Sequence, residues 1–453
     1  MKQKYDLTQG SILGKLLLVA LPIMGTQLLQ MAYNLTDMFW LGRLSSDVVA
    51  AAGTAGMYLW LSNGLMFIGR MGAEIGVSQN LGRGDRETAR SYAQHAVTLG
   101  TLLGVLFAVV MVAFNRPLIG FFGVQEAHVC AAAERYLIIT ALAIPFTFVS
   151  GAIAGAFNAS GNSRAPFLIN AAGLVINMIL DPIMIFSFDW GIDGAAIATS
   201  LAQIVVFVLS VVAIKWKRTR PLGSFRLFVR MKRDMVVQIF RWSIPIALES
   251  MLFTLLSMIV QRVISSFGAD AIAVSKVGSQ IESMSWLIGG GFASAVTAFV
   301  GQNFGAQKWF RIRKGIGISA VAMAVWGVIV SLLLLFMGGT LFSILLPEAH
   351  LVPMGANYLR ILALCQLPMT LEGVAGGGFR GIGKTLPPSV ASITVNALRV
   401  GLVYVLSASP MGLDGVWWGV TLGAVARGLW IILWFVYTLS RQPKDDLVVQ
   451  TAE

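Results

Sequence analysis

The feature that most constrains this chain is a series of apolar runs that recurs from one end to the other. Each run is about 20 residues long, enough to cross a hydrocarbon core of roughly 30 Å as a helix, and by this rule there are about twelve. Their approximate centres are Gly25, Leu59, Gly104, Leu142, Leu174, Ile204, Leu252, Leu287, Trp326, Ala363, Thr394 and Ala424. The runs are continuous, not alternating in polarity, so we predict an all-α polytopic membrane protein.

Composition and charge placement agree with that fold class. The 453 residues are 57% hydrophobic and 12% charged, too apolar for a soluble protein of this size. The net charge of +12 would suggest a nucleic-acid partner in a soluble chain. Here the basic residues gather in alternate loops, such as "GRGDRETAR" at 82–90 and "QKWFRIRK" at 307–314. By the positive-inside rule we expect these loops and both termini to face the cytoplasm of a plasma (bacterial inner) membrane, with lipids and no nucleic acid as partners.

The two halves of the sequence repeat each other. "LPIMGTQLLQMAYNLTDMFWLGRLSSDVVAA" (21–51) aligns with "IPIALESMLFTLLSMIVQRVISSFGADAIAV" (244–274), which places Pro22 over Pro245 at an offset of 223 residues (245 − 22). The same offset pairs "SQNLG" with "GQNFG" and Pro145 with Pro368. We predict an N-terminal six-helix lobe at 1–214, a basic cytoplasmic linker at 215–234, a C-terminal six-helix lobe at 235–440 and a cytoplasmic tail at 441–453.

An even number of spans in each half makes the two lobes parallel repeats, which we expect to surround a central cleft. This pseudo-symmetric arrangement is typical of transporters that work by alternating access. A duplicated bundle can also form an uncoupled channel, and the repeat alone leaves that alternative open.

Two intramembrane carboxylates break the repeat. Asp37 is replaced by Val260 in the second half, and Asp181, after a gap of one residue, is replaced by Val403. Shared packing therefore does not explain either carboxylate, and charged groups inside a membrane are functional by default. Asn177 lies one helical turn before Asp181, and Thr199 lies on the next span. If these polar groups converge, they form an oxygen-rich pocket with two carboxylates, which suits a hard cation such as sodium or shared protons.

Further polar or adaptable side chains are candidates for the substrate cleft. They share either a helical face with the acidic residues or a place in an intramembrane segment. They are Gln30, Met31, Tyr33, Asn34, Asn158, Asn170, Gln203, Glu249 and Glu372. The C-terminal half has its own charged set, for which internal ion pairs and substrate contact are both open. Its members are Glu249, Arg262, Lys276, Glu282, Glu372, Arg399 and Arg427.

The sequence gives little support for nucleotide binding or for an enzymatic reaction. It lacks the phosphate loop GxxxxGK[ST], and "GGGFRGIGK" at 376–384 lies between membrane spans, not after a strand. We therefore expect no enzymatic activity and no cofactor, with energy supplied by an ion gradient.

In these features the chain resembles the multidrug and toxic compound extrusion (MATE) family, in particular its prokaryotic DinF-like branch. The resemblance rests on "LPI" and "IPI", "QNLG" and "QNFG", and "GAFNASGNSRAP" with "GGFRGIGKTLPP". It implies an antiporter that exports organic cations or amphipathic toxins in exchange for protons or sodium, acting as a monomer. It also implies that Asp37, Asn177, Asp181 and Thr199 form the coupling site. A lipid-linked sugar flippase of the same superfamily is the alternative, because Arg262, Lys276, Arg399 and Arg427 would suit an anionic substrate.

Overall fold

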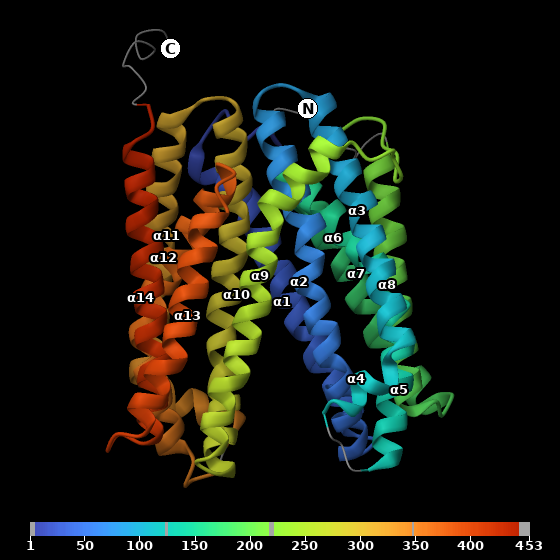
Figure 1. Ribbon diagram of the computed structural model, residues 1–453, viewed down its shortest axis with the longest axis vertical. Coiled ribbons are helices and arrows are strands. Elements are labelled where there is room, and N and C mark those ends of the chain that lie inside the picture. Colours follow the sequence, from blue (N-terminus) through green and yellow to red (C-terminus); the bar gives the residue numbers. More distant parts are fainter. Residues whose placement is uncertain (1–4, 123–125, 217–221, 347, 444–453) are drawn as a thin grey trace. The chain divides into compact units, whose positions relative to one another are not determined.

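A computed structural model describes residues 5–122, 126–216, 222–346 and 348–443, and every regular element among them is helical (Figure 1). The elements that precede the basic linker are α1 (Ile12–Gly42), α2 (Ser46–Gly82), α3 (Arg86–Ala113), α4 (Asn115–Gly120), α5 (Ala127–Ala141), α6 (Ile144–Ala159), α7 (Arg164–Pro182), the π-helix η2 (Ile183–Ser187) and α8 (Gly191–Lys215). Those that follow it are α9 (Arg233–Ser265), α10 (Ala269–Gly305), α11 (Trp309–Leu345), α12 (Val352–Gly381), α13 (Leu386–Ser407) and α14 (Leu413–Ser440).

The helices account for the predicted membrane spans. Within the described residues, nine single helices are long and apolar enough to cross a membrane, and the bent pair α5 and α6 brings this to ten. The predicted centres Leu59 and Ala363 fall in the two remaining long helices, α2 and α12. Both are long enough to span a bilayer, at 37 and 30 residues. Their lower hydropathy comes from intramembrane charges such as Arg70, Glu74 and Glu372. The chain is thus an integral membrane protein with twelve spans.

By its contacts the chain divides into two compact units. Unit 1 comprises Met1–Asp6 and Gly25–Ala247, and unit 2 comprises Leu7–Met24 and Leu248–Glu453. The start of α1 packs in a core of unit 2 that includes Leu16 and Phe299, while the start of α9 packs in a core of unit 1 through Ile239. The predicted lobe boundaries placed the start of α1 in the N-terminal lobe and the start of α9 in the C-terminal lobe, whereas each packs in the other unit. A sequence repeat shows where the two copies begin, but it does not show which residues they pack against.

The fourth span of the first half is broken, whereas its counterpart in the second half is continuous. Helices α5 and α6 meet at a bend of 45° around Leu142, and Pro145 lies in the first turn of α6. The counterpart α12 runs through Pro368 as a single helix. The same aligned proline therefore begins one helix and lies inside another, which a local sequence pattern does not distinguish.

Aligned glycines bring the last helix of each half against the end of the helix before it. A Cβ on Gly194 of α8 would stand 2.5 Å from the Met184 carbonyl oxygen of η2. A Cβ on Gly415 of α14 would stand 2.2 Å from the Leu406 carbonyl oxygen of α13. Because the obstacle is backbone in both places, a larger residue would displace a helix. The shared segments "GIDGAA" and "GLDGVW" thus reflect one packing requirement.

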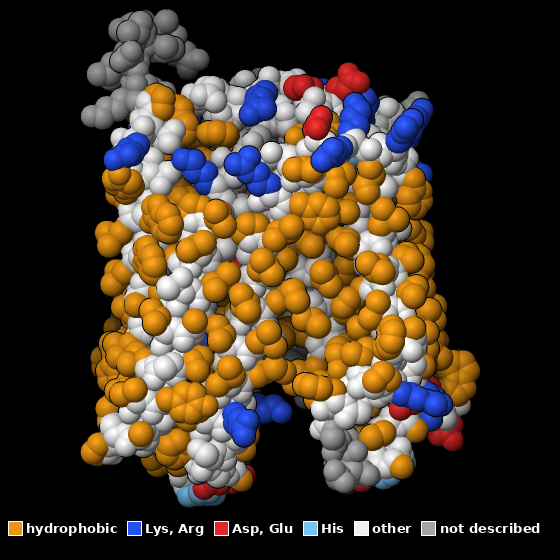
Figure 2. Space-filling model, in the orientation of Figure 1, with side chains coloured by type: hydrophobic (Ala, Val, Ile, Leu, Met, Phe, Trp, Pro, Cys, Tyr) orange, Lys and Arg blue, Asp and Glu red, His pale blue; other side chains and the backbone are white. Residues whose placement is uncertain are grey.

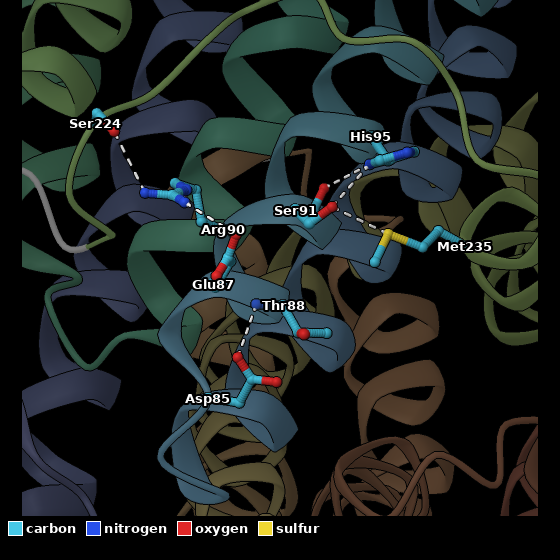
Figure 3. A network of polar contacts seen from close by, with 8 residues as sticks. All are labelled: Asp85, Glu87, Thr88, Arg90, Ser91, His95, Ser224 and Met235. Atoms are coloured by element: carbon cyan, nitrogen blue, oxygen red, sulfur yellow. Dashed lines mark hydrogen bonds and ion pairs between the residues drawn. The ribbon is translucent and has the colours of Figure 1, made fainter.

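The described part of the basic linker lies on α3. The Thr98 hydroxyl accepts a hydrogen bond from the Val229 N–H at 3.3 Å, and His95 Nε2 accepts one from the Lys232 N–H at 3.0 Å. Closer to the start of α3, Arg90 donates to the Ser224 hydroxyl at 3.3 Å and Ser91 lies against the Met235 sulfur (Figure 3). Residues 222–232 are therefore held on unit 1 by backbone and side-chain contacts, whereas residues 217–221 of the predicted linker lie outside the described residues.

The surface matches a helix bundle that faces lipid. On the face drawn in Figure 2, apolar side chains cover the middle of the helices in each unit, and Lys and Arg side chains gather mainly toward one end. Large exposed apolar residues include Leu106, Phe336 and Leu433, at 61%, 76% and 67% exposure. Such exposure would be costly in water and is expected against hydrocarbon.

Candidate functional site

A polar pocket lies inside unit 1, where α1, α7 and α8 meet. Its cavity volume is about 20 Å³, which is room for a water molecule or a small ion and not for a drug-sized molecule. Four predicted residues line it, namely Gln30, Tyr33, Asn170 and Gln203. The other lining residues are Thr26, Leu29, Gly173, Leu174, Ala202 and Val206. The helical spacing that placed polar groups on one face of each span thus brings them together in three dimensions.

Gly173 permits the close approach of α7 and α8 beside this pocket. A Cβ at this position would stand 2.3 Å from Val206 Cγ2. A side chain at this position would require Val206 to change its rotamer or the two helices to move apart. The pocket therefore depends on a small residue that the sequence analysis did not single out.

The predicted coupling residues gather in the same unit. Asn177 and Asp181 are both fully buried on α7, and Asn177 Nδ2 donates to Asp181 Oδ1 at 3.0 Å. Asp37 of α1 is near enough for its charge to act on Asp181 and on Tyr33. Tyr33 in turn lies beside Thr199 and Gln203 of α8. The two carboxylates, the amide and the hydroxyls therefore come together from three helices, and their role as the coupling site stays a prediction.

Oxygen atoms at this site lack partners within the described protein. These buried atoms make no hydrogen bond to another described residue: Tyr33 OH, Asp37 Oδ1, Asn177 Oδ1, Asp181 Oδ2 and Thr199 Oγ1. Buried polar groups in folded proteins are normally satisfied, so a cluster of them calls for an additional partner. All five are oxygens and two belong to carboxylates. This donor set fits a hard cation or shared protons better than an anion.

Asp181 lies at the end of α7, next to an irregular stretch of backbone. Pro182 follows it and lacks an N–H, and the chain then continues as the π-helix η2 over Ile183–Ser187. π-helical turns are rare and frequently occur at functional sites. The aligned helix α13 carries no such turn after Val403, so the irregular backbone and the carboxylate occur together in one half only.

Two predicted cleft residues of unit 1, Met31 and Asn158, are not among the residues that line the pocket. Met31 is half-buried on α1, and Asn158 is buried on α6 at 3% exposure, with its Oδ1 lacking a hydrogen bond to any described residue. The side chain of Asn34 lies outside the described residues. Their assignment to the substrate cleft stays a prediction.

The two predicted carboxylates of the second half belong to unit 2 and have partners of their own. Glu249 on α9 accepts a hydrogen bond from the Ser389 hydroxyl at 2.8 Å. Glu372 on α12 pairs with Arg427 of α14, whose Nε lies 2.9 Å and 3.0 Å from its two carboxylate oxygens. These residues have different chemical surroundings from the acidic set of unit 1.

Tyr136 is a neighbour of the acidic site that sequence reasoning missed. It is 4% exposed on α5 and lies within electrostatic range of Asp37, Tyr33 and Asp181. Its repeat counterpart is Tyr358 (358 − 136 = 222), so a search for residues that differ between the halves passes over it. The pattern "YL" in "ERYLIIT" and "NYLRILA" is the signal that would have found both tyrosines.

The fold and the site together define the class of this protein. It is a duplicated helical membrane protein with twelve spans and an acidic, oxygen-rich site in its first half. The MatE family model matches residues 22–183 and again 245–405, in agreement with the internal repeat, and the chain belongs to this family. It is 25% identical to a probable multidrug resistance protein NorM of Thermotoga maritima, over 93% of this chain and 92% of that protein.

Other comparisons cover the whole length as well. The multidrug export protein MepA of Staphylococcus aureus is 22% identical over 100% of this chain and 98% of that protein. A solved structure of a multidrug resistance MATE family transporter of the MOP superfamily, in its outward-facing conformation, aligns with a TM-score of 0.90 at 20% identity. The alignment covers 98% of this chain and 100% of that one. At this identity the structural likeness establishes the fold.

Proposed function

We propose that the chain is a secondary active multidrug efflux antiporter. It exports cationic or amphipathic small molecules in exchange for protons or sodium ions, by alternating access of its two halves. The observation that carries this proposal is the cluster of five unpartnered oxygens around Asp37 and Asp181, beside a polar pocket of the same unit. The names of its relatives, a multidrug resistance protein and a multidrug export protein, support the substrate class.

The coupling ion is bound, in this proposal, by Asp37, Asn177, Asp181 and Thr199, with Tyr33 nearby. Two acidic groups close together in a poorly hydrated site disfavour a state in which both carry a charge. A proton or a sodium ion relieves that repulsion, and its release restores it. Occupancy of the site therefore changes the charge of unit 1, which is what a coupled transporter needs in order to favour different conformations.

Placement in the plasma membrane with both termini cytoplasmic is part of the same proposal, and so are a monomeric state and the lack of enzymatic activity. Arg83 and Lys308, in the loops after the second and eighth spans, and Arg311, in the first turn of α11, support the orientation by the positive-inside rule. The flippase alternative loses one of its four basic residues, because Arg427 is neutralised by Glu372.

The test is efflux from proteoliposomes loaded with a fluorescent organic cation, under a pH gradient or a sodium gradient imposed alone. We expect one of the two gradients to drive transport. In the Asp37→Asn variant we expect coupled efflux to fall by about tenfold or more, while folding and expression are retained, because only the charge is removed. A downhill flux that needs neither gradient would indicate a channel. Unchanged coupled efflux in Asp37→Asn would overturn the role of Asp37.

A further inference from the structure

The described part of the basic linker shows a regular alternation of buried and exposed side chains. Residues 224–232, which we call the strap, lack regular secondary structure. Every second side chain of the strap is apolar and is buried or half-buried, and the side chains between them are exposed. The inward set is Phe225, Leu227, Val229 and Met231, and the outward set is Ser224, Arg226, Phe228, Arg230 and Lys232. A period of two is that of an extended chain, so the strap has an inner and an outer face.

The inner face of the strap is fixed on α3. Phe225 is buried in a core that includes Val97 of α3. The hydrogen bond from the Val229 N–H to the Thr98 hydroxyl holds the backbone a few residues further along. The strap cannot turn over without breaking these contacts, so its outer face has a fixed orientation on unit 1.

The strap lies at the level where α3 enters the hydrocarbon. After His95, α3 continues to Ala113 without a charged residue, over 18 residues (113 − 95 = 18). At a rise of about 1.5 Å per residue this length is about 27 Å, close to the roughly 30 Å of a bilayer core. Because the strap bonds to His95 and Thr98, it lies near the membrane surface. Trp216, which follows α8 where the linker begins, is 59% exposed, and tryptophan is enriched at this level.

The outer face combines unpaired cations with an exposed aromatic ring. Among the residues that the structure describes, none forms an ion pair within 4.0 Å with Arg226, Arg230 or Lys232. Phe228 stands between the two arginines on the same face and is 67% exposed. The three cations are therefore available to a partner of opposite charge, and the ring is available to an apolar one.

The positive-inside rule explains only part of this pattern. It accounts for basic residues in the linker, but it does not call for an aromatic ring among them. A ring between cations is expected where the ring enters the acyl region and the charged groups stay at the level of the phosphates. Asp234, exposed in the first turn of α9, is the only acidic residue in the sequence 216–248, so the surroundings are strongly basic.

We propose that the outer face of the strap is a docking site for anionic phospholipids. Arg226, Arg230 and Lys232 bind the phosphate groups, and the ring of Phe228 lies among the acyl chains just beneath them. Bound lipid then fastens to the membrane surface the segment that connects the two halves of the chain. This inference goes beyond the proposed function, because it does not depend on which solute is transported or on the coupling ion.

The test measures amide hydrogen exchange in the full chain, reconstituted in nanodiscs of phosphatidylcholine alone or of an equal mixture of phosphatidylcholine and phosphatidylglycerol. Opening of the strap must release any bound headgroup, so peptides covering 224–232 should exchange about fivefold more slowly in the mixture. The double variant Arg226→Gln with Arg230→Gln should reduce this difference to less than about twofold. Phe228→Ser should speed exchange in both lipid compositions, because insertion of the ring does not depend on headgroup charge.

A second double variant, Arg83→Gln with Arg86→Gln, is the matched control. It also removes two exposed arginines, but Arg86 precedes Thr98 by 12 residues (98 − 86 = 12), about 18 Å along the axis of α3. We expect this variant to keep the fivefold difference between the two lipid compositions. Exchange of the α3 peptide 90–100 should be the same in every variant, which checks that the fold is intact.

Two results would overturn the docking site. One is equal exchange of the wild-type strap in both lipid compositions, and the other is loss of the difference in the Arg83 and Arg86 variant as well, which would indicate a general surface potential. If inorganic phosphate added to the phosphatidylcholine nanodiscs slows exchange to the same extent, the face binds free anions and the assignment to lipid is wrong. None of these measurements involves transport, so the antiporter is tested separately.

Discussion

The buried charged residues of this protein differ mainly in the partners that they contact. Asp181 is fully buried, and its one described hydrogen bond comes from the neutral amide of Asn177. Glu372 has the guanidinium of Arg427 at contact distance. A carboxylate that is already neutralised by a cation has little reason to exchange protons or sodium. A carboxylate with a free oxygen and a second acid nearby has both the capacity and the electrostatic reason.

This contrast predicts the relative importance of two carboxylates. We expect Asp181→Asn to reduce ion-coupled efflux on the order of tenfold, and Glu249→Gln to reduce it by less than about threefold. Glu249 accepts a hydrogen bond from Ser389, which a glutamine oxygen can also accept, and it is separate from the acidic set of unit 1. Initial rates in proteoliposomes under the driving gradient measure both effects. Equal or reversed losses would place the coupling site in unit 2.

A second prediction at this scale concerns Asp85, the N-cap of α3 on the loop side of the helix. Asp85 Oδ1 accepts a hydrogen bond from the Thr88 N–H at 2.9 Å, and this bond lowers the pKa of the carboxyl. Asp85→Ala should speed amide exchange in the first turn of α3 by about fivefold, the factor for a cap worth about 1 kcal/mol. Asp85→Asn should change it little, because asparagine caps equally well.

The sign of the pH effect at Asp85 follows from the direction of the shift. Because the folded-state pKa is depressed, the carboxylate contributes stability above the ordinary aspartate pKa of about 4 and loses it as the pH falls through the lower folded-state value. The asparagine variant has no such titration. Exchange measured at decreasing pH, after correction for intrinsic exchange rates, should therefore diverge between wild type and Asp85→Asn only under acidic conditions. Parallel profiles would contradict this account.

At the scale of elements, the linker is not a free tether along its described part. Residues 222–232 lack regular secondary structure, yet their backbone groups bond to α3 at Thr98 and His95. His95 uses both ring nitrogens, because Nδ1 also lies 2.7 Å from the Ser91 carbonyl oxygen. A short stretch of irregular chain is ordered when its N–H groups find acceptors of this kind.

We predict that Thr98→Ala releases this part of the linker. Loss of the hydroxyl leaves the Val229 N–H without its acceptor, so peptides covering 224–232 should exchange their amide hydrogens several-fold faster, as expected for a lost bond of about 1 kcal/mol. Thr101→Ala is the matched control, since the Thr101 hydroxyl bonds to the Val97 carbonyl of its own helix at 2.9 Å. If both variants behave alike, the hydroxyl of Thr98 does not hold the linker.

The whole molecule is built from two copies that share their first helices. Helix α1 belongs to unit 2 as far as Met24 and to unit 1 from Gly25, and α9 belongs to unit 1 as far as Ala247 and to unit 2 from Leu248. The two changes occur at aligned positions (247 − 24 = 223), each shortly after an interior proline, Pro22 or Pro245. Proline inside a helix removes a backbone hydrogen bond and lowers the resistance to bending.

We therefore predict that Pro22→Ala makes the protein more stable and slower. The alanine N–H can complete the helix, and an interior proline costs up to about 3 kcal/mol, so the melting temperature in detergent should rise. Turnover in proteoliposomes should fall severalfold if α1 must bend during the cycle. Pro353→Ala is the control, because Pro353 stands in the first turn of α12, where no N–H is required. Faster transport in Pro22→Ala would contradict a bending role.

The predictions from the sequence agreed best with the structure for features that depend on local hydrophobicity or on the helical period. Apolar runs placed all twelve spans, since hydrocarbon imposes a minimum length on each, and helical spacing put Asn177 and Asp181 on one face. The repeat identified Asp37 and Asp181 as residues that packing does not require. It missed Tyr136 for the converse reason, because a residue kept in both halves looks structural even when it lies within electrostatic range of the acidic site.

The sequence by itself determined the membrane location, the duplication and the polar faces, because each depends on hydrophobicity and period along the chain. Only the tertiary structure decided which charges are neutralised. Glu372 and Glu282 look alike as lone acids in apolar spans, but one meets Arg427 and the other only Gln366. It also decided that α1 and α9 each pack in two units. Both outcomes depend on contacts between residues far apart in the chain, which a linear pattern does not specify.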